Sequence, residues 1–194
     1  MPQIERSSLL SLEAYAKQRA SFRAKVIAHK KDRKVQLGDH LTLEFEDELT
    51  IRYQVQEMLR VERIFEEDGI QGELDAYNPL VPDGRNLKAT MMLEYPDPEE
   101  RKRELARLKG IADRVWIRVA DFERVFAVAD EDLERENEEK TSSVHFLRFE
   151  FTDGTAKALK SGVDLAVGVD HPAYRAEVPA IPRAVRDSLA GDLA

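Results

Sequence analysis

Short segments in which apolar and polar residues alternate recur along this chain, and they constrain its fold more than any other feature. Successive side chains of an extended chain point to opposite faces, so each such segment has one apolar and one polar face. The pattern is present at residues 41–46, 88–95, 114–120, 124–129, 144–151 and 164–170. We therefore expect a largely antiparallel sheet with one buried face.

Helical periodicity dominates the N-terminal part. It predicts a helix over 8–32, broken near 18–21, and a second helix over 48–66 that Asp47 caps. Glycine and proline punctuate residues 67–86, which predicts either a long ordered loop or a short helix followed by a loop. The proline-rich loop at 77–86 should pack against the body, because Tyr77, Leu80 and Val81 are apolar and need cover.

Helices also follow the strand segments of the second half. Asp97, Pro98 and Glu100 occupy the N-cap, first and third positions of a helix that Gly110 ends, an arrangement typical of a helix start. Two further helices are expected, one over 155–160 and one after Pro182. The N-terminal helices would then pack on the sheet.

The order of elements indicates an α+β class and one domain over 1–194. A helical part with one strand occupies 1–86, and an α+β part occupies 87–194. Residues 88–151 follow the order of a ferredoxin-like unit if the acidic connector 130–140 forms a helix.

Composition excludes several classes of function. The chain has no cysteine, which rules out disulfides, thiolate metal sites and cysteine nucleophiles. No stretch approaches the roughly 20 apolar residues that span a bilayer, so we expect a cytoplasmic protein without membrane association. Residues 1–40 carry a net charge of +5 and the remainder −13. The basic patch is too small for strong phosphate binding, which makes nucleic acid an unlikely partner.

Two histidines lie in the inward register of strand segments. His145 shares a face with Leu147 and Phe149, and His171 falls in step with Val169, next to Asp170. Glu62 lies near the middle of the apolar arc of its predicted helix. Two imidazoles and one carboxylate are the ligand set of non-heme iron(II) and of catalytic zinc. The hypothesis is therefore a metal site at His145, His171 and Glu62.

A purely structural interpretation explains the same residues. His145 would bond a backbone carbonyl, and His171 would close a turn through Asp170. Glu62 would pair with a nearby arginine. The two interpretations differ in geometry, because a shared site requires the two strands to be antiparallel neighbours whose ends meet.

Several stretches together resemble a bacterial family known as a domain of unknown function. They are residues 46–65, 76–84, 91–97, 139–151 and 169–174, and the likeness covers nearly the whole chain. Members of that family are often encoded beside a rubrerythrin-like protein and an iron–sulfur oxidoreductase. The resemblance implies a redox or peroxide-stress setting and supplies no catalytic residue.

Two functions from different classes follow. The first is a non-catalytic accessory or interaction protein of a redox system, whose acidic body docks an iron–sulfur oxidoreductase or a rubrerythrin-like protein. The second is a small metalloprotein or metal-dependent enzyme that uses His145, His171 and Glu62 to hold iron or zinc. The sequence predicts no substrate and no oligomeric state.

Overall fold

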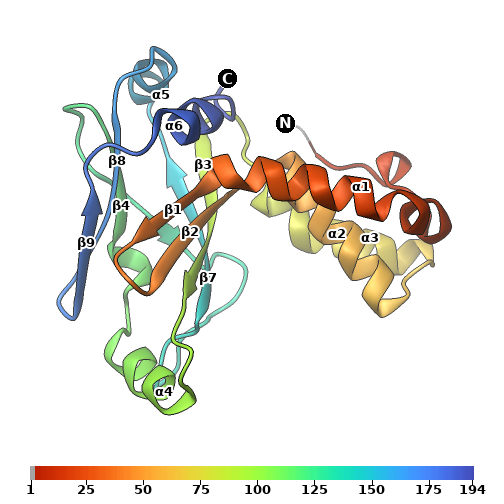
Figure 1. Ribbon diagram of the computed structural model, residues 1–194, viewed down its shortest axis with the longest axis horizontal. Coiled ribbons are helices and arrows are strands. Elements are labelled where there is room, and N and C mark those ends of the chain that lie inside the picture. The colour runs from red at the N-terminus through yellow and green to blue at the C-terminus, as the bar shows by residue number, and fades with distance from the viewer. Residues whose placement is uncertain (1–2) are drawn as a thin grey trace.

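The computed structural model describes residues 3–194 and confirms the α+β class, with two antiparallel sheets and a group of helices at one end (Figure 1). The helices are α1 (Leu12–Lys30), α2 (Glu48–Glu62), α3 (Glu67–Tyr77), α4 (Pro98–Arg107), α5 (Asp153–Lys160) and α6 (Arg183–Ala190). The strands are β1 (Lys34–Leu37), β2 (Leu41–Glu46), β3 (Asn86–Leu93), β4 (Val115–Val119), β5 (Val125–Phe126), β6 (Val128–Ala129), β7 (Val144–Glu150), β8 (Leu165–His171) and β9 (Tyr174–Val178). Short 3-10 turns are η1 (Arg6–Ser8), η2 (Lys31–Arg33), η3 (Asn78–Leu80) and η4 (Ala112–Arg114).

Helices α1, α2 and α3 form a separate layer beside the sheets (Figure 1). The side chain of Ser11 caps α1 by accepting a bond from the Ala14 amide. The helix then runs without the predicted break, and the hydroxyl of Ser21 donates to the carbonyl of Gln18 within it. No helix among residues 3–194 has both the length and the apolar character needed to cross a membrane.

The start of α2 is as predicted, but its end is not. The Asp47 carboxylate accepts from the Thr50 amide at 2.9 Å, and the Thr50 hydroxyl accepts from the Asp47 amide, which completes a capping box. The helix ends at Glu62, four residues early, because Arg63 adopts left-handed backbone angles (φ 56°). Helix α3 follows almost at once, so the short-helix alternative is the correct one.

Glu57 joins α1 to α2 through a network of charge-assisted hydrogen bonds. Its carboxylate accepts from the Tyr15 hydroxyl at 2.7 Å and from two guanidinium nitrogens of Arg19 at 2.7 and 2.9 Å. Arg60 donates a further bond at 3.0 Å. The hydrogen bonds from Arg19, more than those from Tyr15 and Arg60, lower the pKa of Glu57 to about 2.

This network predicts acid sensitivity of the helical layer. A carboxyl whose pKa falls from 4.5 to about 2 on folding stabilises the fold above pH 4.5, and this stabilisation is lost as the pH falls towards 2. Glu57→Gln should lower the free energy of unfolding at pH 7 by about 1–3 kcal/mol. In this variant the free energy of unfolding should also fall less steeply between pH 4.5 and pH 2. Urea denaturation as a function of pH measures both effects, and an unchanged pH profile in the variant would contradict the assignment.

The first sheet has the strand order β1-β2-β3-β7-β6, and each pair of neighbours is antiparallel. β2 coincides with the predicted segment and is buried on both faces. Its outer face is buried in part because Lys30 of α1 forms an ion pair with Glu44 and the Thr50 hydroxyl of α2 donates to the carboxylate of Glu46. Strand β1 was not predicted, because its single alternation of Val35 and Leu37 is too short to detect.

The second sheet has the strand order β5-β4-β8-β9, again antiparallel. The predicted segment 124–129 divides at Ala127 into β5, which pairs with β4, and β6, which pairs with β7. β3 and β4 therefore belong to different sheets, and the connector 130–140 forms no helix. The ferredoxin-like unit expected over 88–151 is thus wrong, since alternation alone does not show which sheet a strand joins.

Buried apolar side chains form two clusters. The larger includes the inward rows of both sheets and extends to side chains of α4, α5 and α6. The smaller lies in the helical layer and includes Ile51 of α2 and Leu74 of α3. Tyr77, Leu80 and Val81 of the proline-rich loop pack in this smaller cluster, as predicted.

Arg33 links the helical layer, the first sheet and α6. Its side chain is 1 % exposed, and its guanidinium donates to the carbonyls of Phe45 (2.9 Å) and Glu46 (3.1 Å). The same group forms an ion pair with Asp192, just after α6, and lies 3.4 Å from Asp47 at the start of α2. One buried cation therefore neutralises carboxylates from two distant parts of the chain.

Candidate functional site

His145 is buried at the start of β7, and both of its ring nitrogens have partners. Nδ1 lies 2.5 Å from a carboxylate oxygen of Asp130. Nε2 lies 3.0 Å from the Thr141 hydroxyl and 3.0 Å from the carbonyl oxygen of Ser142. The inward orientation predicted from the strand register is present, and the imidazole has no nitrogen left over to bind a metal.

His171 is also buried, at the end of β8, where it closes a turn. Its Nδ1 accepts from the Ala173 amide at 3.2 Å, so Nε2 carries the proton and donates to the Lys109 carbonyl at 2.9 Å. Asp170, next to it, is exposed and pairs with Arg175. His171 thus closes the β8–β9 turn through the Ala173 amide and not through Asp170, and it joins this turn to the segment after α4.

Glu62 does not point into the core. It is exposed at the last position of α2, where it raises the pKa of Glu73 only as a secondary influence after the burial of that side chain. The helical periodicity placed Glu62 on the apolar face of its helix. That placement is wrong because α2 ends at this residue, beyond the part of the helix that packs against the core. Residues 3–194 hold no group of three or more His, Cys, Asp or Glu side chains suited to a metal. The predicted set of His145, His171 and Glu62 is not assembled.

The residue missed beside His145 is Asp130, the first of the acidic connector. Its carboxylate also accepts from the Phe146 amide at 3.0 Å, and its own amide donates to the Phe146 carbonyl at 2.9 Å, which continues the pairing of β6 with β7 by one residue. Its backbone has φ +52°, which turns the chain sharply away from the sheet. The signal in the sequence is an aspartate directly after an alternating segment, since Asp tolerates left-handed angles better than most residues.

Residues 130–139 of this connector, which precede Lys140 and are called the acidic connector from here on, are held in place along their length. The Glu136 carboxylate accepts from the Gly110 amide at 2.7 Å. The Lys109 ammonium donates to the Glu138 carbonyl at 3.1 Å. The Ser142 amide bonds back to the Arg135 carbonyl at 2.8 Å. These contacts fasten the connector to the end of α4 and to β7.

Most carboxylates of the connector still face solvent. The exposed acidic residues are Glu131, Asp132, Glu134, Glu138 and Glu139. Leu133, in their midst, is 54 % exposed. A shallow hollow of about 480 Å³ lies beneath them, between the connector and the segment Gly110–Asp113, with His145 at its base. The result is an ordered acidic surface with one apolar side chain at its centre.

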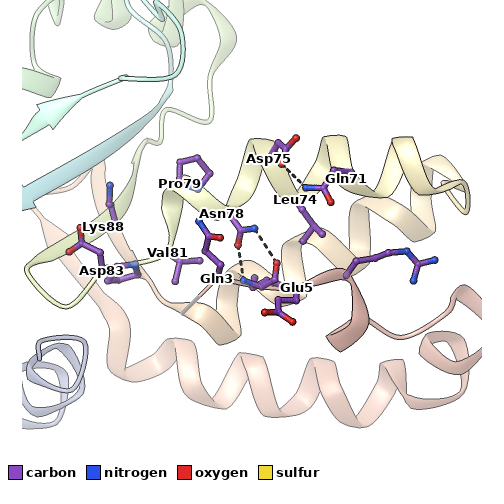
Figure 2. Close-up of a pocket in the computed structure, with 13 residues that line it drawn as sticks. Gln3, Glu5, Gln71, Leu74, Asp75, Asn78, Pro79, Val81, Asp83 and Lys88 are labelled. Atoms are coloured by element: carbon purple, nitrogen blue, oxygen red, sulfur yellow. Dashed lines mark hydrogen bonds between the residues drawn. The ribbon is translucent and has the colours of Figure 1, made fainter. Parts of the chain in front are cut away.

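A second hollow, of about 550 Å³, lies where the N-terminal segment crosses α3 and η3 (Figure 2). Asn78 bonds both backbone groups of Ile4, accepting from its amide at 2.9 Å and donating to its carbonyl at 3.1 Å. Lys88 lines one end, and burial lowers the pKa of its ammonium. Charges of both signs surround this hollow, so it favours no single class of ligand.

Comparison with known proteins identifies the family. Residues 3–193 match the family described as protein of unknown function (DUF3501), and the chain belongs to it. The chain is similar to a solved structure from Burkholderia pseudomallei K96243, described as a novel protein of unknown function. The two share 58 % identity over 100 % of each chain, with a TM-score of 0.95. No curated protein matches the chain.

Proposed function

We propose that this protein is a non-catalytic accessory protein that docks a partner through its acidic connector. The observation that supports this most is the concentration of charge. Residues 130–139 hold seven carboxylates against one arginine, a net charge of −6, while the whole chain carries −8. A surface of one sign accelerates association with a partner of opposite sign and suppresses association with others.

The connector is already structurally ordered, and this supports the same proposal. An unstructured acidic segment would lose conformational entropy when it binds, whereas this connector is already held by Asp130, Glu136 and the backbone of Glu138. Exposed Leu133 adds an apolar contact at the centre of the charged surface. The buried histidine therefore has a structural role, which is to position this surface.

The partner class follows from charge and from the family resemblance. A basic surface with a central apolar recess would complement the connector. We propose an iron–sulfur oxidoreductase or a rubrerythrin-like protein, in a redox or peroxide-stress setting, and in this scheme the partner carries the metal. This chain would contribute docking and orientation only.

Charge reversal on the connector tests the proposal. Glu134 and Glu138 have exposed side chains without hydrogen-bond partners among residues 3–194, so Glu134→Lys with Glu138→Lys changes charge without breaking the connector. We expect binding to the oxidoreductase, measured by biolayer interferometry at low salt, to weaken about tenfold or more. The matched control is Glu62→Lys with Glu66→Lys, two exposed side chains also without hydrogen-bond partners among residues 3–194, which makes the same change of charge in the helical layer.

Two outcomes would contradict this proposal. One is equal weakening by the control variant, which would show that net charge alone matters. The other is unchanged binding of the connector variant, which would place the interface elsewhere. Wild-type protein that binds neither the oxidoreductase nor the rubrerythrin-like protein would refute the partner class.

A further inference from the structure

A third hollow, of about 250 Å³, lies where the helical layer meets the outer face of the first sheet. Ile51, Tyr77 and Leu80 give it apolar walls from the helical layer, and Met92 and Phe146 do so from β3 and β7. Polar side chains gather at its other end. Cavities with apolar walls and a few polar groups are the usual form of a small-molecule site. This one lies just below the range of about 300–1,000 Å³ for drug-sized ligands, so it suits a smaller molecule.

The carboxylate of Glu46, in β2, belongs to the polar end of this hollow. Glu46 lines the hollow and is otherwise buried, with 8 % of its surface exposed. One carboxylate oxygen accepts from the Thr50 hydroxyl at 2.5 Å, and the other accepts from the Thr90 hydroxyl at 2.6 Å. Donors to both oxygens are the arrangement that stabilises an ionised carboxylate.

The lysines on this side of the sheet are engaged by another carboxylate. Lys30 and Lys34 both pair with Glu44. Among residues 3–194, Glu46 is therefore left without an ion pair. Burial raises the pKa of Glu46, and the two hydroxyl bonds and the charge of Lys30 offset this only in part. A buried carboxylate is costly unless a cation pairs with it, so a cationic ligand would supply what the chain itself does not.

Hydrogen bonding around Glu46 favours the same kind of ligand. Both threonine hydroxyls spend their hydrogen atoms on Glu46, and the Lys30 ammonium donates to Glu44. The groups around Glu46 thus offer acceptors to the hollow. An ammonium group has three N–H donors and no acceptor, so it matches this end. A carboxylate or phosphate would instead place a second negative charge beside Glu46.

We propose that this hollow binds a small primary ammonium compound, whose charged nitrogen donates to the Glu46 carboxylate and whose apolar body lies between the helical layer and the first sheet. The site is separate from the acidic connector and does not depend on the docking proposal.

Benzylammonium is a suitable probe, because it joins one ammonium group to one small apolar ring. Benzyl alcohol is its neutral counterpart and benzoate its anionic one. Calorimetric titration of the full chain should give an affinity for benzylammonium at least about tenfold above that for benzyl alcohol, and no binding of benzoate. The methyl signal of Met92, assigned with Met92→Leu, should move and saturate with benzylammonium in a ¹H–¹³C spectrum.

Two variants make the test specific. Glu46→Gln keeps the size of the side chain and removes its charge, so it should weaken benzylammonium about tenfold or more. Its affinity for benzyl alcohol should change less than about threefold, which would show that the apolar walls are intact. The matched control is Glu62→Gln, at the exposed end of α2, which changes the net charge equally and should leave both affinities unchanged.

Acidification tests the unsubstituted protein. Protonation of Glu46 should weaken benzylammonium and leave benzyl alcohol unaffected. Glu44, which also lines the hollow, stays ionised longer, because the bonds from Lys30 and Lys34 outweigh its burial and lower its pKa. A Met92 signal that does not move, equal affinities for benzylammonium and benzyl alcohol, or an unchanged benzylammonium affinity in Glu46→Gln would overturn the proposal.

Discussion

Arg33→Met is expected to lower the free energy of unfolding by about 3–5 kcal/mol, the largest effect predicted for any single substitution in this chain. The substitution keeps an apolar stem and removes the guanidinium. The carboxylates of Asp192 and Asp47 then lose the buried guanidinium that pairs with both of them. The carbonyls of Phe45 and Glu46 also lose their donor. Breaking one partner of a buried pair leaves an uncompensated charge, which costs more than the pair itself contributes.

Guanidinium chloride denaturation measures this effect. The matched control is Arg23→Met, on the exposed side of α1, which should change stability by less than about 0.5 kcal/mol. A loss below about 1 kcal/mol for Arg33→Met would show that α6 and the start of α2 are held by other contacts. A double variant, Arg33→Met with Asp192→Asn, should recover part of the loss, because it removes one unpaired charge.

Gly168→Ala is the second substitution with a large expected effect. It should lower the free energy of unfolding by about 1–3 kcal/mol. The added methyl group would lie 2.3 Å from Cζ2 and 2.6 Å from Cε2 of Trp116, far inside van der Waals contact. The indole would have to leave the sheet, and Arg124 would move with it. Thermal denaturation gives the stability, and the tryptophan emission should shift to longer wavelength as the ring becomes exposed.

Gly72→Ala is the matched control for this substitution. Gly72 lies within α3, and a Cβ there would meet no atom within 4 Å. Alanine favours a helix interior by about 0.5–1 kcal/mol relative to glycine, so this variant should be more stable than the wild type. Destabilisation by both variants, or by neither, would contradict the packing described for Trp116.

Most helices and strands of this fold could be predicted from the sequence, because helix caps and strand alternation depend only on neighbouring residues. The cap at Asp97 accepts from the Glu100 amide at 2.7 Å, as its spacing predicted. The inward register of His145 and His171 also holds. Which sheet a strand joins depends on contacts that are distant in sequence, and β5 and β6 show this, since two adjacent residue pairs enter different sheets.

The candidate metal site failed for the same physical reason. Periodicity places each side chain on a face of its own element, but it does not place the elements relative to one another. β7 and β8 lie in different sheets, and Glu62 belongs to the helical layer. The packing of Trp116 on Gly168 was also beyond prediction, because the close approach of an indole to a glycine of the neighbouring strand is visible only in three dimensions.

The association rate of the chain with the proposed partner, an iron–sulfur oxidoreductase, tests the docking proposal most directly when it is measured by stopped flow as a function of ionic strength. Electrostatic steering by the connector predicts a rate that falls steeply with added salt. The fall should be shallower in Glu134→Lys with Glu138→Lys and unchanged in the control Glu62→Lys with Glu66→Lys. A rate that does not depend on salt, or that both double variants reduce equally, would contradict docking through residues 130–139.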